Sequence, residues 1–230
     1  MVSMGLSDYF GRFWFAAEPV FGIVMTLCFL GILKNEALYS YPPVLVDRIV
    51  AMVVGAAISC CVAWGIVDGI FYAWENHSIA GRKNLTIDYA KGQTQKAESL
   101  KMVEEDLQDT YVDLLNEDEK KSIYEKVVAN LAKVESREKV ALKDDFMTIF
   151  LDFCLNTGAC LVIILPLALL QNWVAVPDLV TLGMIIAIIM MFFFGIWIET
   201  RKSWKLKLKK GALYAILGVI ITLLTWVLGG

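Results

Sequence analysis

Residues 49–74 read IVAMVVGAAISCCVAWGIVDGIFYAW, an apolar run whose one charged side chain is Asp68. A helix of roughly 20 apolar residues crosses the ~30 Å hydrocarbon core of a bilayer, so this run can span a membrane and project beyond it. Four more runs of the same kind occupy residues 16–33, 146–170, 179–198 and 211–228. The sequence therefore predicts an all-α integral membrane protein with five transmembrane helices.

The charged residues gather in one part of the chain. Residues 76–145 hold 12 of the 21 Lys and Arg and 15 of the 24 Asp and Glu, although the whole chain is 58% hydrophobic with a mean hydropathy of +0.61. This division predicts a charged insert between the second and third spans and argues against a water-soluble enzyme. A net charge of −3, without a basic patch interleaved with aromatic residues, excludes nucleic acid as an expected partner.

The links between the spans set the expected orientation in the lipid bilayer. Six Lys and Arg lie in residues 201–210, two lie in residues 34–48, and none lies in residues 171–178. Because Lys and Arg concentrate in cytoplasmic loops, the six-charge link, the insert and the N-terminus are expected in the cytoplasm, and the C-terminus outside. Residues 1–15 lack the basic start of a signal peptide and predict an interfacial helix, or alternatively an ordinary aromatic anchor.

The insert is predicted to fold as two or three helices. Residues 85–145 are rich in Glu, Lys, Ala, Leu and Val and contain no proline. Asn116 precedes three acidic residues, which is typical of a helix start because Asn caps helices and acids favour the first turn. An apolar stripe follows at helical spacing and needs a packing partner; its members are Ile123, Val127, Val128, Leu131 and Val134.

Acidic residues of the insert are candidate metal ligands. Their spacings of 7, 4 and 4 residues predict one shared helix face, with Met102 adjacent as a soft donor; the acids are Glu98, Glu105, Asp109 and Asp113. Carboxylate oxygens suit Mn²⁺, Fe²⁺, Mg²⁺ or Ca²⁺. The alternative is a solvated face with Glu–Lys pairs, and composition does not separate the two interpretations.

Three acidic residues belong to, or border, the first two spans. Burying an ionisable side chain in a membrane costs at least a few kcal/mol, so Glu18, Asp68 and Glu75 are functional candidates. Asp152 lies near the start of the third span. The alternative for Asp68 is a structural hydrogen bond with Tyr72 or with the backbone of another helix.

Helical spacing places these acids on two stripes. On the first span, Glu18 shares a stripe with Gly22 and Met25. On the second span, the stripe consists of Cys61, Gly65, Asp68, Tyr72 and Glu75. If the stripes face one another, Glu18, Asp68 and Glu75 form a carboxylate mouth, with Met25 and Cys61 deeper. Oxygen and sulfur donors without histidine fit Fe²⁺ or Mn²⁺ better than structural zinc.

The organisation resembles that of the vacuolar iron transporter family. Residues 55–60, GAAISC, are similar to a small-residue motif of that family's second helix, and residues 155–158 with 165–167 look like its third helix with a Leu-Pro exit. The glycines from Gly195 to Gly229 follow its last two helices. The resemblance implies five spans, a charged helical insert, a homodimer, and proton-coupled export of Fe²⁺ from the cytoplasm.

The sequence departs from that family at its intramembrane ligands. Met25 stands where the first-helix motif has Asp, the second-helix carboxylate aligns near Met52, and the metal-binding methionine aligns near Cys60. Glu18-Pro19 and residues 64–69 look instead like a divergent prokaryotic branch.

Three classes of function follow from these features. The leading hypothesis is a transporter of Fe²⁺ or Mn²⁺, with no tightly bound cofactor, in which the insert captures metal and Asp68 exchanges it for a proton. The second is a membrane-anchored interaction protein whose insert mediates dimerisation or docking. An enzyme ranks last, since the chain has no histidine cluster, nucleophile elbow or phosphate-binding loop.

Overall fold

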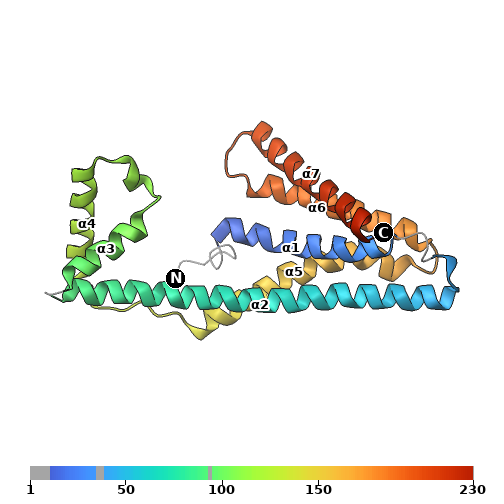
Figure 1. The fold of residues 1–230 in the computed structure, drawn as a ribbon, viewed down its shortest axis with the longest axis horizontal. Helices are drawn as coiled ribbons and strands as arrows, with labels where there is room; N and C mark the ends of the chain where they lie inside the picture. Colours follow the sequence, from blue (N-terminus) through green and yellow to red (C-terminus); the bar gives the residue numbers. More distant parts are fainter. Residues whose placement is uncertain (1–10, 35–38, 93–94, 230) are drawn as a thin grey trace. The chain divides into compact units, whose positions relative to one another are not determined.

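The computed structural model describes residues 11–34, 39–92 and 95–229, which fold into helices and connecting segments without a strand. Five helices are long and apolar enough to cross a membrane (Figure 1): α1 (Gly11–Ile32), α2 (Pro43–Lys91), α5 (Leu142–Leu170), α6 (Val176–Ile198) and α7 (Trp204–Gly229). The prediction of an all-α chain with five candidate spans is thereby confirmed. Of the expected interfacial helix at residues 1–15, the first ten residues lie outside the described part of the chain, and residues 11–15 begin α1.

The second span differs from the predicted layout. α2 runs without a break from Pro43 to Lys91, so the insert does not begin with a new element at residue 76. Residues 75–91 contain no proline and one glycine, and therefore nothing in them stops a helix. The drop in hydropathy at residue 76 marks a change of polarity and not the end of the helix.

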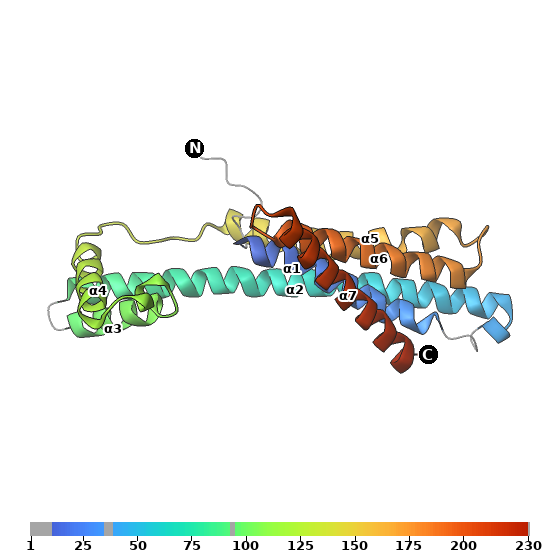
Figure 2. The ribbon, with the colours of Figure 1, turned by 90° about the horizontal axis from the view of Figure 1, so that it is seen from above.

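The chain divides into two compact units. Met1–Tyr72 and Lys143–Gly230 form the first, and Ala73–Leu142 forms the second. In the first unit, α1 lies beside α2 and α5 (Figures 1 and 2) and buries an apolar stripe against α5 and α6. The buried members of this core include Ile23, Leu27, Ile163, Leu167, Val180 and Met184.

The outer surfaces of the spans remain apolar. On α7, Leu213, Ile216, Leu224 and Val227 are exposed, as are Phe150 and Leu161 on α5. Such a surface is unfavourable in water and suits contact with lipid chains, where every backbone polar group is satisfied within its helix. The first unit therefore has the character of a multi-pass membrane protein.

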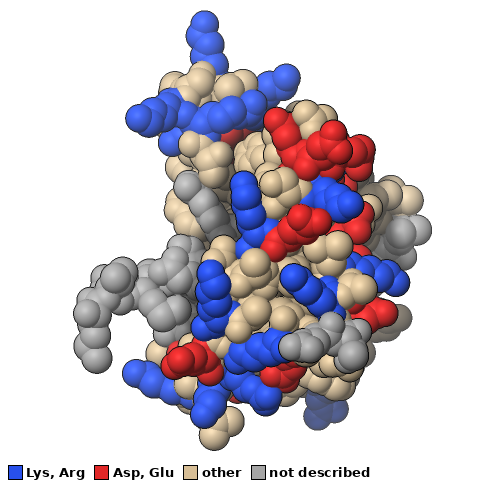
Figure 3. All heavy atoms as spheres, turned by 90° about the vertical axis from the view of Figure 1, so that its left-hand side faces the viewer, with Lys and Arg blue, Asp and Glu red and all other residues tan. Residues whose placement is uncertain are grey.

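The second unit forms a small core of its own. α3 (Lys96–Leu107) and α4 (Glu117–Leu131) flank a short 3-10 turn, Tyr111–Leu114. Val128 of α4 is fully buried, with Tyr124 and Val103 beside it and Ala90 of α2 completing the cluster. The apolar stripe of α4 thus finds its partners in α3 and α2, except that Val134 lies beyond the end of the helix. Both acidic and basic side chains lie on the face of the molecule that Figure 3 shows.

The predicted start of α4 at Asn116 is confirmed. The backbone N–H of Glu119 donates to Asn116 Oδ1 at 2.9 Å, and the N–H of Asn116 donates to Glu119 Oε2 at 3.4 Å, which completes a capping box. This cap satisfies backbone groups that otherwise lack a partner in the first turn. By contrast, residues 132–141 form no helix, although the composition of residues 85–145 predicted one.

Replacing Asn116 with alanine is expected to lower the free energy of unfolding of α4 by about 1 kcal/mol, because the side-chain cap is lost. Amide hydrogen exchange of residues 117–131 in the full chain measures this as faster exchange. Asn130→Ala is the control, since Asn130 Nδ2 donates to the Lys126 carbonyl within the same helix and caps nothing. Equal exchange in the two variants would contradict the role of the cap.

Candidate metal centre

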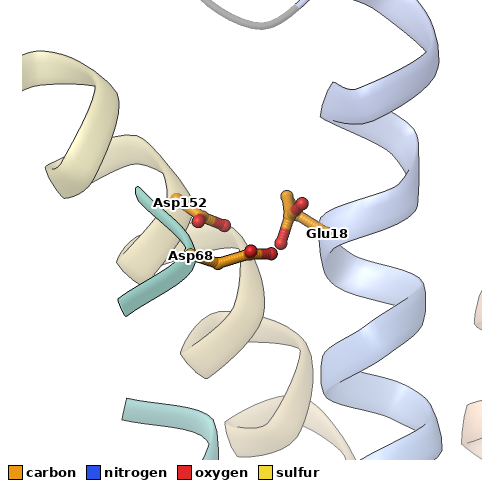
Figure 4. A group of neighbouring side chains, drawn as sticks. All are labelled: Glu18, Asp68 and Asp152. Carbon is orange, nitrogen blue, oxygen red and sulfur yellow. The ribbon is translucent and has the colours of Figure 1, made fainter. Parts of the chain in front are cut away.

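One carboxylate from each of three helices converges inside the first unit. Glu18 of α1, Asp68 of α2 and Asp152 of α5 each place one oxygen within 4.8 Å of the other two. Figure 4 shows the three side chains turned toward a common point. Glu18 and Asp152 are fully buried, and Asp68 is partly exposed. Within the described residues, this is the group of three or more acidic, Cys or His side chains close enough to hold a metal ion.

Glycines allow α2 to approach α5 at the level of these carboxylates. A Cβ at Gly65 would lie 2.8 Å from the Cα of Phe153, and a Cβ at Gly69 would lie 2.6 Å from the Cα of Ile149. Both distances are too short for any larger residue, so the α5 backbone occupies the space of a side chain. Asp68 lies between the two glycines, and their contacts bring it next to Asp152.

Three of the six carboxylate oxygens at the site have no hydrogen-bond partner. Tyr72 Oη donates to Glu18 Oε1 at 2.8 Å. Glu18 Oε2 and both oxygens of Asp152 are buried and accept no hydrogen bond. None of the ion pairs among the described residues joins Glu18, Asp68 or Asp152 to a Lys or Arg.

Three negative charges at this distance inside an apolar bundle need compensation. Burying one unpaired carboxylate is already unfavourable, and like charges within a few ångströms repel strongly at low dielectric. Protons or a bound cation supply the missing positive charge. The group can therefore hold either a cation among oxygen ligands or a set of protons.

The sequence-predicted members of the site are only partly brought together. Glu18 and Asp68 meet as predicted, but Glu75 is exposed, belongs to the second unit and is no member of the group. Asp152 takes the third position, because Gly22 and Gly65 both lie against α5 and not against each other. The expectation that the stripes of α1 and α2 form a two-helix mouth is therefore corrected to a three-helix group.

A signal for Asp152 was present in the sequence. Asn156 follows it by four residues in a mostly apolar run, so two polar side chains share one face of the third span. Its position near the start of that span made Asp152 resemble an ordinary charge at a helix end.

Sulfur atoms lie between α1 and α2, further along the same helices. Cys60 Sγ is 3.6 Å from Met25 Sδ, and Cys61 Sγ is 3.9 Å from Thr26 Oγ1. Met25 and Cys61 are thus close to the seam, as predicted, but they do not belong to the carboxylate group, which is made of oxygen donors alone.

The insert does not gather its candidate ligands. α3 ends at Leu107, and Asp109 has a left-handed backbone with φ of 62°, so Asp109 and Asp113 leave the predicted helix face. Glu105 Oε2 accepts from Arg82 at 2.9 Å, and Asp113 is 3.9 Å from Lys120 Nζ. Glu98 is exposed in the first turn of α3. The prediction of a shared face required one long helix through these residues. Because the chain turns after Leu107, the four acidic side chains do not lie on one helix face.

No protein-family model matches the chain, and no match is found among curated proteins or solved structures. What the site can do follows from its geometry and chemistry.

Proposed function

We propose that this chain is a homodimeric, five-span transporter that exports a divalent cation, Fe²⁺ or Mn²⁺, from the cytoplasm in exchange for protons. The observation that carries the proposal is the buried group of Glu18, Asp68 and Asp152, with one oxygen of each within 4.8 Å of the others. The homodimer and the direction of export are what the resemblance to vacuolar iron transporters implies.

The charge of the group supports the exchange of metal for protons. A divalent cation compensates two of the three carboxylate charges, and protons compensate them when the ion leaves. Because Glu18 and Asp152 are fully buried and the group has no basic partner among the described residues, one form of charge compensation must replace the other. Oxygen ligands of this kind suit Mn²⁺ and Fe²⁺.

The position of the group along the helices supports loading from the cytoplasm. With the Lys- and Arg-rich link at residues 201–210 inside, α1 and α5 start on the cytoplasmic side. Glu18 and Asp152 then lie within three turns of those starts. Asp68, the partly exposed member, gives the group contact with the surface.

The ion pairs of the insert favour a second candidate function. Arg82 binds Glu105 and Asp106, Lys83 binds Glu138, and Arg137 binds Asp88. Acidic side chains that pair with Lys and Arg of the same insert form a solvated surface. Such a surface suits an interaction module better than a metal-capture surface. In this candidate the chain is a membrane-anchored interaction protein and transports nothing.

Binding and flux measurements on the reconstituted full chain separate the two candidates. The transporter is expected to bind Mn²⁺ in isothermal titration with release of protons, and to accumulate Mn²⁺ in proteoliposomes when a proton gradient is imposed. Protein-free liposomes and an excess of Mg²⁺ are the controls. Absence of both binding and flux would exclude transport and leave the interaction protein.

A further inference from the structure

A second unsatisfied polar group lies one helical turn beyond the carboxylates. Asn156 of α5 is fully buried, and neither its Oδ1 nor its Nδ2 has a hydrogen-bond partner. Its backbone lies against Gly22 of α1, and a Cβ at Gly22 would sit 3.0 Å from Asn156 Oδ1. The amide oxygen is thus aimed at α1 one turn past Glu18, in a place where the glycine leaves room.

The contacting residues of α1, α2 and α5 repeat at helical spacing and define three levels. The first level holds Glu18, Asp68 and Asp152. Four residues along α1 and α5, the second level holds Gly22 and Asn156, whereas Gly65 of α2 lies against Asp152 and Phe153. Another four residues along, the third level holds Thr26, Cys61 and Cys160. Successive levels are about 6 Å apart, since each residue of a helix rises about 1.5 Å.

The third level offers further ligand atoms. Thr26 Oγ1 donates to the Gly22 carbonyl at 2.6 Å, and Cys61 Sγ approaches the same carbonyl at 3.8 Å. Cys61 and Cys160 belong to one buried cluster. Hydroxyl, carbonyl and thiol groups therefore meet at the third level, and sulfur favours transition metals over Mg²⁺ or Ca²⁺.

A cavity with a mixed polar and apolar lining lies further along α2 and α5, away from the carboxylates. It has a volume of about 470 Å³ and lies between the first turns of α2 and the end of α5, where Asp47, Gln171 and Asn172 line it. Between this cavity and the third level, the buried side chains of Ala57 and Ile164 close the seam. The three levels thus run from the carboxylate group toward this cavity. Apolar side chains lie between the third level and the cavity.

The geometry points to Asn156 as a second cation station, which takes a divalent transition-metal ion from Glu18, Asp68 and Asp152 on its way along the α1–α2–α5 seam. This inference rests on the proposed transport function. Leaving a buried amide without partners is unfavourable for folding, whereas an amide oxygen that coordinates a passing ion is satisfied whenever the ion is there. A neutral ligand holds the ion weakly enough to let it continue.

Asn156→Leu tests the station because leucine has nearly the shape of asparagine without its oxygen. In the reconstituted full chain, Mn²⁺ affinity at the carboxylates is expected to stay within about threefold of wild type, while Mn²⁺ flux falls about tenfold or more. The melting temperature is expected not to fall, since an unsatisfied polar group is removed. Thr157→Val is the matched control: it removes a buried, partnerless hydroxyl about 100° further around α5 and should leave flux unchanged.

Asn156→Asp keeps the oxygen ligand and supplies a second, independent measurement. In isothermal titration, Asn156→Asp is expected to bind one more Mn²⁺ ion per chain than the wild-type protein does. Wild-type flux in Asn156→Leu, equal flux loss in Thr157→Val, or no additional ion in Asn156→Asp would each overturn the second station while leaving the carboxylate site in place. A wild-type protein without Mn²⁺ binding or flux would instead overturn the transport function itself.

Discussion

Replacing Asp152 with asparagine is expected to reduce Mn²⁺ transport by the reconstituted protein roughly 100-fold or more, because a buried charged ligand is lost while its size is kept. Asp152 is fully buried and both its oxygens lack a hydrogen-bond partner, so no other group takes over its role toward the ion. Initial rates of Mn²⁺ uptake into proteoliposomes measure the effect. Asp68→Asn and Glu18→Gln are expected to change transport in the same direction.

The thermal stability of Asp152→Asn is expected not to fall, although its transport does. Without metal, Asp152→Asn removes one of three mutually repelling groups from the apolar interior, so its melting temperature should equal or exceed that of wild type. Asp144→Asn is the control, since Asp144 lies in the first turn of the same helix, two turns before Asp152. Full transport by Asp152→Asn, or equal losses in the control, would contradict a metal centre at this position.

The second large effect is expected from Gly69→Ala. Its Cβ would fall 2.6 Å from the Cα of Ile149, so α2 and α5 must move apart at the level of Asp68 and Asp152. Forcing an extra methyl group into such a contact lowers the free energy of unfolding by about 1–3 kcal/mol. Thermal unfolding in detergent measures this loss, and isothermal titration should show weaker Mn²⁺ binding because the carboxylates separate.

Gly55→Ala is the matched control on the same helix. A Cβ at Gly55 meets nothing within 4 Å, so this substitution adds helix propensity without a clash and should raise stability by up to about 1 kcal/mol. Equal effects of the two substitutions would show that the close approach of α2 to α5 at Gly69 is not what holds the carboxylate group together.

Local sequence signals predicted the elements of this protein well. Hydropathy located the spans because the need for about 20 apolar residues depends on composition alone. Asn116 marked the start of α4 because a cap forms within four residues of chain. The end of α3 at Leu107 was missed, since no proline or glycine stands there and the acidic spacing continued past it.

The continuity of α2 was missed for a related reason. The predicted boundary at residue 76 rested on polarity, but polarity decides which solvent surrounds a helix and not whether the helix continues. Residues 75–91 lack a stop signal and gain packing for Ala90 against Val103 and Val128, so the helix extends to Lys91.

By itself, the sequence determined that the chain is helical, that five of its helices suit a bilayer, and that Glu18 and Asp68 are costly enough there to suggest function. These conclusions depend on composition and on spacing along one helix. Only the tertiary structure decided that Asp152 completes the group, that Glu75 stays out of it, and that Gly22, Gly65 and Gly69 lie against α5. Which helices pack together depends on close backbone approach between residues far apart in the chain. The periodicity of one helix shows which of its residues share a face, but not which other helix packs against that face.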